Sequence, residues 1–211
     1  TRLCHASSVA ALMEGVNSGA VTAPFTAAND ADCIITIGCR PTENHPVAAT
    51  YIKKAAKRGA SLIVMDPRKH GLTRHAKYML QFKSGADVAL LGAMIHTIIE
   101  EDLIDKQYVQ GMTEGFEEIK ENSKDFVPEK MSEICGIDAK IIRKVARIYA
   151  KSERSIIFWG MGISQHIHGT DNARCLIALA MITGQIGRAG TGLHPLRGQN
   201  NVQGASDAGL I

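Results

Sequence analysis

The sequence predicts an α/β fold: a Rossmann-like parallel sheet with helices on both faces and a helical insertion near residues 103–150. Short apolar, β-branched runs alternate along the chain with longer segments of helical periodicity. Each run ends at a glycine or a charged turn, as do the strands of a parallel sheet covered on both faces. With 211 residues, 45% of them hydrophobic, the chain can bury one core, so residues 1–211 are expected to form a single domain.

The first helix is expected to begin at a hydroxyl cap. Ser7 or Ser8 can accept hydrogen bonds from the first backbone N–H groups of a helix that runs to about Val16. This start would place Cys4 and His5 just ahead of the helix.

Two strands and the helix between them follow. Residues 33–37 form an apolar run that stops at Gly38, which is typical of a buried strand. A proline opens the segment 46–57, where a first helical turn tolerates it, and a glycine beyond the segment favours a helix end. Residues 61–65 form the second apolar run and predict the second strand.

The second half of the chain repeats the alternation with more helix. Residues 78–82 predict a third strand, and Asp87 is expected to cap the long apolar helix that follows. Short amphipathic helices are expected over 103–150. Residues 155–159 predict a fourth strand, and the almost wholly apolar segment 171–183 predicts a buried helix.

The carboxyl ends of the four predicted strands carry glycine or polar residues. Open parallel sheets bind their ligands in the crevice outside these ends. The pattern therefore predicts a nucleotide-type crevice. The segments expected to line it are Gly38, 66–68, 83–87 and 160–165.

Three features of this crevice each have a purely structural alternative. The segment 160–162, Gly-Met-Gly, would let the backbone approach a pyrophosphate; it lacks the third glycine of the nicotinamide fingerprint and also suits a plain tight turn. The Asp-Pro-Arg segment 66–68 could be an exposed ion pair, or could offer a carboxylate to a ribose or base and a cation to a phosphate. Asp87 could cap a helix, accept hydrogen bonds from guanine, or do both.

Composition argues against several classes of protein. The net charge of +3 without a basic run disfavours nucleic acid as a partner, and no apolar stretch approaches the ~18 residues of a membrane span. The five cysteines are scattered and include no Cys-x-x-Cys pair, which indicates a reduced, cytoplasmic protein. His166 and His168 lack a nearby third ligand, so an exposed pair is favoured over a metal site.

Two segments near opposite ends of the chain point to chemistry. Cys4 and His5 put a soft thiolate donor beside an imidazole. The segment 195–204, Pro-Leu-Arg-Gly-Gln-Asn-Asn-Val-Gln-Gly, surrounds Arg197 with glycines and four amides. It is suited to hydrogen-bond a large polar ligand while offering one fixed positive charge. Taken alone, the cysteine could be buried and inert and the arginine could be structural.

These two segments resemble the active-site segments of molybdenum- or tungsten-dependent formate dehydrogenases, which are molybdopterin oxidoreductases. The matching stretches are Leu-Cys-His-Ala-Ser-Ser-Val-Ala at 3–10 and Leu-Arg-Gly-Gln-Asn-Asn-Val-Gln-Gly-Ala at 196–205. Glu-Gly-Phe-Glu-Glu at 114–118 and Trp-Gly-Met-Gly at 159–162 resemble further landmarks of that family in the same order. The resemblance spans essentially the whole chain.

The resemblance implies that the full-length protein binds two molybdopterin guanine dinucleotides, which hold one Mo or W ion, and oxidises formate to carbon dioxide. By motif, Cys4 would be the metal ligand, His5 the proton-handling group and Arg197 the anchor for formate. The chemistry agrees, because a thiolate suits a metal surrounded by sulfur and a guanidinium fork holds a carboxylate. The residues implied to line one guanine dinucleotide are Gly38, Asp66, Arg68, Gly85, Asp87, Met161, Gly162, Gln165, Gly198 and Gln199.

The resemblance also implies parts outside this chain. A 4Fe–4S cluster segment is expected before Thr1, with iron–sulfur or other electron-transfer subunits as partners, and further domains are expected after Ile211. The chain is then expected to fold alone but not to turn over alone. The alternatives are another molybdopterin oxidoreductase, a dinucleotide-binding fold without metal, or a nicotinamide-dependent dehydrogenase, which the incomplete glycine fingerprint disfavours. The sequence does not choose between Mo and W, or between hydride transfer and proton abstraction.

Overall fold

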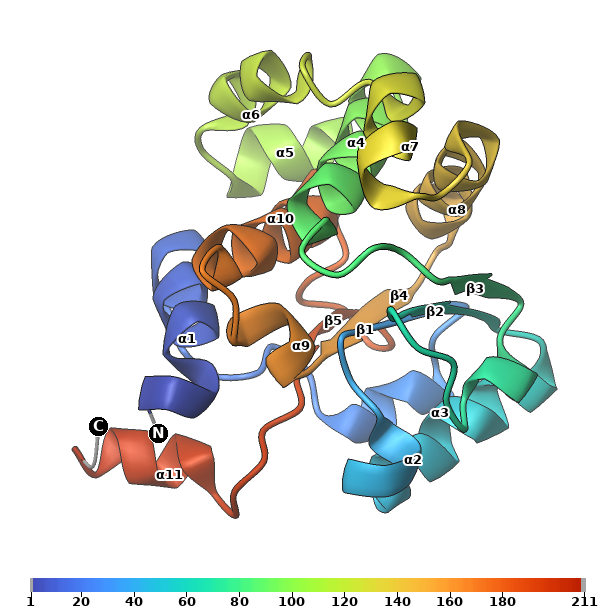
Figure 1. Cartoon of the computed structure of the whole chain (residues 1–211). Helices are drawn as coiled ribbons and strands as arrows, with labels where there is room; N and C mark the ends of the chain where they lie inside the picture. The colour runs from blue at the N-terminus through green and yellow to red at the C-terminus, as the bar shows by residue number, and fades with distance from the viewer. Residues whose placement is uncertain (1, 210–211) are drawn as a thin grey trace.

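The computed structural model describes residues 2–209 and confirms the predicted fold class (Figure 1). Its centre is a five-stranded sheet in the order β3-β2-β1-β4-β5, in which all neighbours are parallel. The four predicted strands are present, although the third ends at residue 80 rather than 82. The strands are β1 (Cys33–Ile37), β2 (Ser61–Met65), β3 (Tyr78–Leu80), β4 (Ser155–Trp159) and β5 (Gly192–Pro195).

The sequence does not predict β5, and the reason is its composition. The strand contains a glycine and a proline, both of which are depleted in strands. Proline lacks the N–H that a central strand needs, but β5 lies at the edge of the described sheet and pairs only with β4 there.

The strand order reverses at β1. The chain runs from β1 outward through β2 to β3, and then places β4 on the other side of β1. β1 pairs with both neighbours, so that Ile37 lies between Met65 and Trp159. The carboxyl ends of β1 and β4 are therefore adjacent at a topological switch point, where open α/β sheets bind ligands.

Helices cover both faces of the sheet (Figure 1). None of the helices that the structure describes has the length and apolar character that a membrane crossing requires. One face carries α2 (Pro41–Asn44), α3 (Pro46–Arg58) and the 3-10 segments η1 (Phe25–Asn29) and η2 (Thr73–His75). The other face carries α4 (Asp87–Glu100), α8 (Ala139–Lys151) and α10 (Gly169–Ile182), with α1 (Arg2–Val16) packed on α10. The predicted helical insertion comprises α5 (Lys106–Met112), α6 (Phe116–Ser123), α7 (Pro128–Cys135) and α8.

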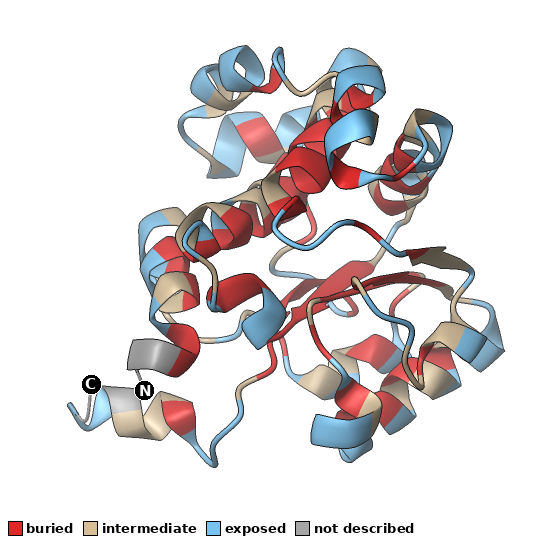
Figure 2. Cartoon of the chain, viewed as in Figure 1, coloured by how far each residue is buried: buried red, intermediate tan, exposed pale blue. Residues whose placement is uncertain are grey.

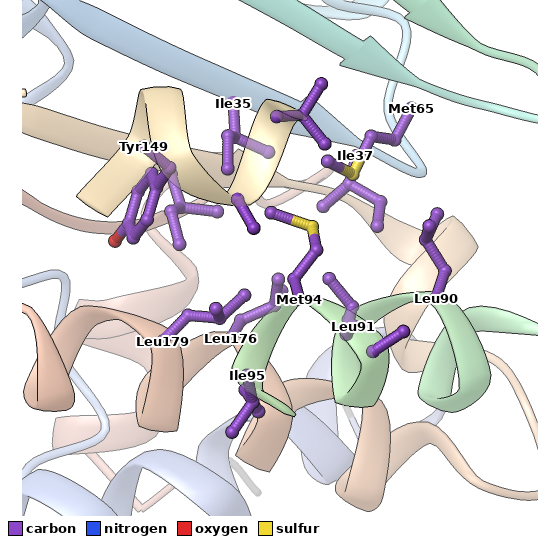
Figure 3. Close-up of a cluster of buried hydrophobic side chains, with 14 of the residues drawn as sticks. Ile35, Ile37, Met65, Leu90, Leu91, Met94, Ile95, Tyr149, Leu176 and Leu179 are labelled. Carbon is purple, nitrogen blue, oxygen red and sulfur yellow. The ribbon is translucent and has the colours of Figure 1, made fainter. Parts of the chain in front are cut away.

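Successive strand residues face two different cores, because side chains alternate along a strand. In β1, Ile35 and Ile37 belong to the core shared with α4 and α10, whereas Ile34 belongs to the core shared with α3. Figure 3 shows the first core, where Leu91 and Met94 of α4 point toward the strands. β1 and β4 are buried along their whole length (Figure 2). This double burial explains why the strands stand out in the sequence as continuous apolar runs.

The predicted start of the first helix is wrong. α1 begins at Arg2 rather than at Ser7 or Ser8, so Cys4 and His5 lie within its first turns. The hydroxyls that suggested a cap bond to a distant part of the chain instead. A local pattern cannot distinguish these two uses of a serine.

The predicted cap of α4 is also wrong by one residue. The N-cap is Ala86, and Asp87 is the first helical residue. Its carboxylate still lies at the amino end of a helix, where the helix dipole favours negative charge.

Candidate active site

The loops that leave β1 and β4 touch backbone to backbone. Gly162 N donates to Gly38 O over 3.0 Å, and Gly38 has a φ of +57°, which glycine adopts without strain. A Cβ at Gly38 would lie 2.8 Å from the carbonyl carbon of Gly162, and one at Gly162 would lie 2.7 Å from Gly38 Cα. Glycine at both positions permits this contact, which holds the two strand ends together.

A crevice of about 760 Å³ opens beside this contact. It lies at the carboxyl ends of β1, β2 and β4, and its volume falls in the range of pockets that enclose organic ligands. Eight of the ten residues predicted to bind a dinucleotide line it: Gly38, Asp66, Arg68, Gly85, Asp87, Met161, Gly162 and Gly198.

Asp66 and Arg68 follow β2 into the crevice and form a turn. The buried Asp66 carboxylate accepts a hydrogen bond from Arg68 N over 2.8 Å. The side chain of Arg68 is exposed, and no ion pair joins the two residues in the described structure. One wall of the crevice therefore offers a cation that suits a phosphate and a carboxylate that suits the donors of a ribose or base.

Asp87 is buried in the same crevice at the start of α4. Desolvation raises the pKa of its carboxyl, and the nearby His166 opposes that shift. His166 is half-buried and lines the crevice, so the predicted exposed pair is correct only for His168. A carboxylate that has lost water gains strongly from N–H donors, so Asp87 is suited to accept hydrogen bonds from a ligand.

Gln165 and Gln199 do not line this crevice. Gln165 is exposed just beyond α9 (Met161–Ser164). Gln199 lines a second cavity of about 390 Å³, together with Arg197, His45 and His194. His45 lines both cavities and therefore forms part of the wall between them.

A buried polar network attaches α1 to the end of β4. Ser8 Oγ accepts from Trp159 Nε1 over 2.8 Å and hydrogen-bonds Ser164 Oγ over 2.7 Å. Ser7 Oγ donates to Ser164 O over 2.6 Å. Cys4 lies about one helical turn ahead of Ser8, so the network brings the first turns of α1 to the crevice edge of the sheet.

Cys4, His5 and Arg197 lie in one desolvated region. Burial, and then the positive charge of Arg197, lower the pKa of His5 to about 4, so its ring is neutral at neutral pH. The Nε2 atom of His5 is buried and has no hydrogen-bond partner in the described structure. Burial also lowers the pKa of Arg197, whereas Asp207 and Cys4 oppose that shift. The structure thus brings together the three residues predicted to be catalytic.

The side chain of Arg197 joins two ends of the chain. Its Nη1 donates to Gln203 Oε1 over 2.8 Å, and its Nη2 donates to the carbonyl oxygen of Gly19. Gln203 lies on α11 (Val202–Asp207), and Gly19 lies in the loop after α1. Nε of Arg197 is buried without a partner among the described residues, so this donor of the guanidinium is unused.

The sequence matches the protein family described as molybdopterin oxidoreductase over residues 1–210. It is 46% identical over 210 residues to the F420-dependent formate dehydrogenase subunit alpha of Methanocaldococcus jannaschii. It is 41% identical over 210 residues to formate dehydrogenase H of Escherichia coli. Each match covers 100% of this chain but only 31% and 29% of those proteins, so the chain spans about a third of their length.

Acetylene hydratase from Pelobacter acetylenicus is a similar solved structure. Its TM-score to this chain is 0.77, with 31% sequence identity. The likeness covers 85% of this chain and 24% of the hydratase. The same kind of domain therefore occurs within proteins that are named for different reactions.

The Gly38–Gly162 contact predicts a stability effect. Gly38→Ala should lower the free energy of unfolding by about 2–4 kcal/mol, because a Cβ adds a backbone clash to the strain of a positive φ. The measurement is denaturant unfolding of the chain. Gly115→Ala is the matched control, since Gly115 also has a positive φ but its Cβ would find the nearest heavy atom 3.8 Å away. Equal losses in the two variants would show that the close contact is not required.

The low pKa of His5 predicts that the free energy of unfolding decreases as the pH is lowered. The folded pKa, about 4, lies below the ordinary value of 6.5, so the unfolded chain binds the proton more tightly. The stabilisation is complete above pH 6.5 and is lost as the pH falls toward 4. Between pH 7 and about pH 4.5, the free energy of unfolding should decrease by about 2–3 kcal/mol less in His5→Gln than in the wild type. Denaturant unfolding at the two pH values measures this difference. A variant with the wild-type pH dependence would contradict this origin.

Proposed function

The chain belongs to the molybdopterin oxidoreductase family, and from this premise we propose that residues 1–211 are the central, molybdopterin guanine dinucleotide-binding domain of a formate dehydrogenase catalytic subunit. The proposed reaction of the full-length protein is the oxidation of formate to carbon dioxide. The similarity to two formate dehydrogenases supports the proposal. The observation that carries it is the desolvated Arg197 guanidinium, whose charge acts on His5 and which interacts with Cys4.

Arg197 is proposed to anchor formate. Formate is a small carboxylate, and a guanidinium keeps its charge and presents a planar fork of donors to such an anion. Partial burial lowers the pKa of Arg197, so the half-buried cation has lost part of the solvation that it would have in water. A bound carboxylate would restore that stabilisation, which favours binding of an anion over binding of a neutral molecule.

His5 is proposed to take up the proton that formate oxidation releases. Its ring is neutral at neutral pH, and Nε2 has no partner, so the tautomer with hydrogen on Nδ1 leaves Nε2 as a proton acceptor. The charge of Arg197 is one cause of the low pKa of His5. Formate bound to Arg197 would offset that charge, and His5 would become more basic when the substrate is present.

The residues of the crevice fit a molybdopterin guanine dinucleotide. A Cβ at Gly85 or Gly198 would find no heavy atom within 4 Å, so both glycines border open space. Asp66, Arg68 and Asp87 supply carboxylates and a cation for ribose, phosphate and guanine groups. We place one of the two dinucleotides of the full-length enzyme here, with Gln165 and Gln199 at its margins.

Cys4 is proposed as the protein ligand of the Mo or W ion, since a thiolate suits a metal bound through sulfur. A metal held by Cys4 would supply the two-electron acceptor that the oxidation of formate needs. The electrons are expected to leave through a 4Fe–4S cluster elsewhere in the full-length protein, toward iron–sulfur or other electron-transfer subunits. We expect the enzyme to be cytoplasmic.

A second candidate is another reaction of the same family. The likeness to acetylene hydratase favours it, because a shared fold does not fix the reaction. The two candidates differ in the charge of the substrate: formate requires a cation such as Arg197, whereas acetylene does not.

Metal and cofactor analysis of the full-length protein, combined with formate-dependent dye reduction, tests the proposal. We expect Mo or W with guanine dinucleotide, and dye reduction that depends on formate. Protein that holds both groups but does not oxidise formate would support the second candidate, and bound nicotinamide would refute both. The 211-residue chain alone should be inactive, because the proposed cluster lies outside it.

Replacement of Arg197 should affect binding and chemistry together. In the full-length enzyme, Arg197→Lys keeps the charge but loses the planar fork, so the KM for formate should rise and kcat should fall. His5→Gln provides the contrast: kcat should fall by roughly 10²–10⁴-fold with a smaller change in KM. Steady-state kinetics with matched metal content measure both effects. A kinetically silent Arg197→Lys would return the arginine to a structural role.

Replacement of Asp87 should weaken cofactor retention. Asp87→Asn keeps the size of the side chain but replaces an acceptor oxygen with a donor, so the lost charge-assisted bonds should cost about 1.5–3 kcal/mol, or roughly ten- to hundredfold in affinity. Extraction of guanine dinucleotide from the full-length protein is the measurement. The control is Asp125→Asn in the exposed helical insertion. If Asp87→Asn lowers Tm but leaves the cofactor content unchanged, Asp87 only stabilises the start of α4.

A further inference from the structure

One imidazole, that of His45, holds the backbone of Arg197 by a long-range hydrogen bond. His45 Nε2 lies 2.6 Å from the carbonyl oxygen of Arg197, across 152 residues of sequence. A carbonyl oxygen can only accept, so Nε2 carries the hydrogen and donates it. The bond therefore fixes which ring nitrogen of His45 is protonated.

His45 is held rigidly between α2 and α3. Its backbone N–H donates to Pro41 O over 2.9 Å, and its carbonyl oxygen accepts from Ala49 N over 2.9 Å. Pro46 follows directly and begins α3, which restricts the backbone of His45 further. The donor thus belongs to the helical layer that packs on one face of the sheet, not to a mobile loop.

The backbone of the segment that receives this bond takes part in few other hydrogen bonds. Leu196 N donates to Trp159 O over 2.7 Å, which extends the pairing of β5 with β4 by one residue. Among the described residues, the backbone N–H and C=O groups of Arg197 and Gly198 make no backbone-to-backbone hydrogen bond. The bond from His45 therefore clamps the chain at the point where it leaves the sheet and where the Arg197 side chain begins.

The lack of a partner at the second ring nitrogen of His45 indicates that the Nε2 hydrogen bond determines the orientation of the ring. Nδ1 is buried and has no hydrogen-bond partner in the described part of the chain. An unpartnered buried acceptor is destabilising, so the ring is oriented for the Nε2 bond alone. His45 lines both the crevice and the cavity beside Arg197, so it stands between the proposed cofactor and substrate sites.

We propose that His45 is a positioning residue for Arg197: by holding the Arg197 carbonyl, it sets the position from which the guanidinium meets formate. This inference rests on the proposed formate dehydrogenase function. It assigns to His45 no contact with the substrate and no proton transfer. Its effect should therefore fall on formate binding more than on the chemical step.

Two amide variants of the full-length protein separate the hydrogen bond from other properties of the ring. Gln can place an N–H where His places Nε2, whereas Asn is one carbon shorter and cannot reach the carbonyl. His45→Asn should raise the KM for formate by about 3- to 10-fold with kcat changed less than twofold or so. His45→Gln should stay within about twofold of the wild type in both constants, because it restores the donor.

Hydrogen–deuterium exchange of residues 196–201 provides a readout that needs no activity. Exchange should be faster in His45→Asn than in the wild type, and near wild type in His45→Gln. His96→Met is the matched control, since His96 Nδ1 hydrogen-bonds Ser123 O over 2.8 Å in the helical layer remote from the crevice. It should change neither the exchange of 196–201 nor the KM.

The two readouts distinguish failure of the inference from failure of the function. Equal exchange and equal KM in the Asn and Gln variants would overturn the role of His45. A larger loss of kcat than rise in KM for His45→Asn would also overturn it, because His45 would then act in the chemical step. If the wild-type protein does not oxidise formate, the proposed function fails, and the exchange measurement alone decides whether His45 holds the Arg197 segment.

Discussion

The backbone contact between Gly38 and Gly162 is the constraint on which the rest of the site depends. It joins the loops that leave β1 and β4, so the strand ends on both sides of the switch point keep one fixed spacing. α9 begins inside this contact, and Ser164 at its end bonds Ser7 and Ser8 of α1. The close approach of Gly38 and Gly162 therefore determines, through α9 and α1, where Cys4 and His5 lie. A side chain at either glycine would move the crevice wall and the proposed catalytic turn together.

Burial affects the pKa values of the histidines at the site more than neighbouring charges do. Desolvation is the largest cause of the lowered pKa of His5 and of His194, so both imidazoles are held toward their neutral form. Arg197 stays charged and lowers both pKa values further, and His45 also lowers that of His194. His194 donates from Nδ1 to Ala23 O over 2.7 Å, which ties β5 to the loop after α1. The region thus combines one permanent positive charge with neutral rings that can accept a proton when an anion arrives.

The sequence was sufficient for the features that depend on local pattern. Strands buried on both faces are continuous apolar runs, and in parallel sheets their carboxyl ends mark the crevice, so the lining from Gly38 to Gly162 could be expected. β5 could not, because an edge strand tolerates Gly192 and Pro195. Bonds between distant segments were equally hidden: Ser8 could be a cap or a tertiary partner, and nothing local indicates that His45 donates to the Arg197 segment. Long-range pairing of polar groups leaves no periodic signal in the chain.

The likeness to acetylene hydratase shows how little the domain alone determines the reaction. At a TM-score of 0.77 the two chains share their architecture, and open α/β sheets in general bind their ligands at the switch point. Beyond the scaffold, a reaction needs side chains that match the charge of its substrate and that accept or donate its protons. Acetylene is neutral and needs no fixed cation, whereas formate is an anion whose oxidation releases a proton. The half-buried Arg197 guanidinium and the unpartnered nitrogen of His5 would meet these two demands of formate, so the proposal of formate as substrate rests on these side chains rather than on the fold.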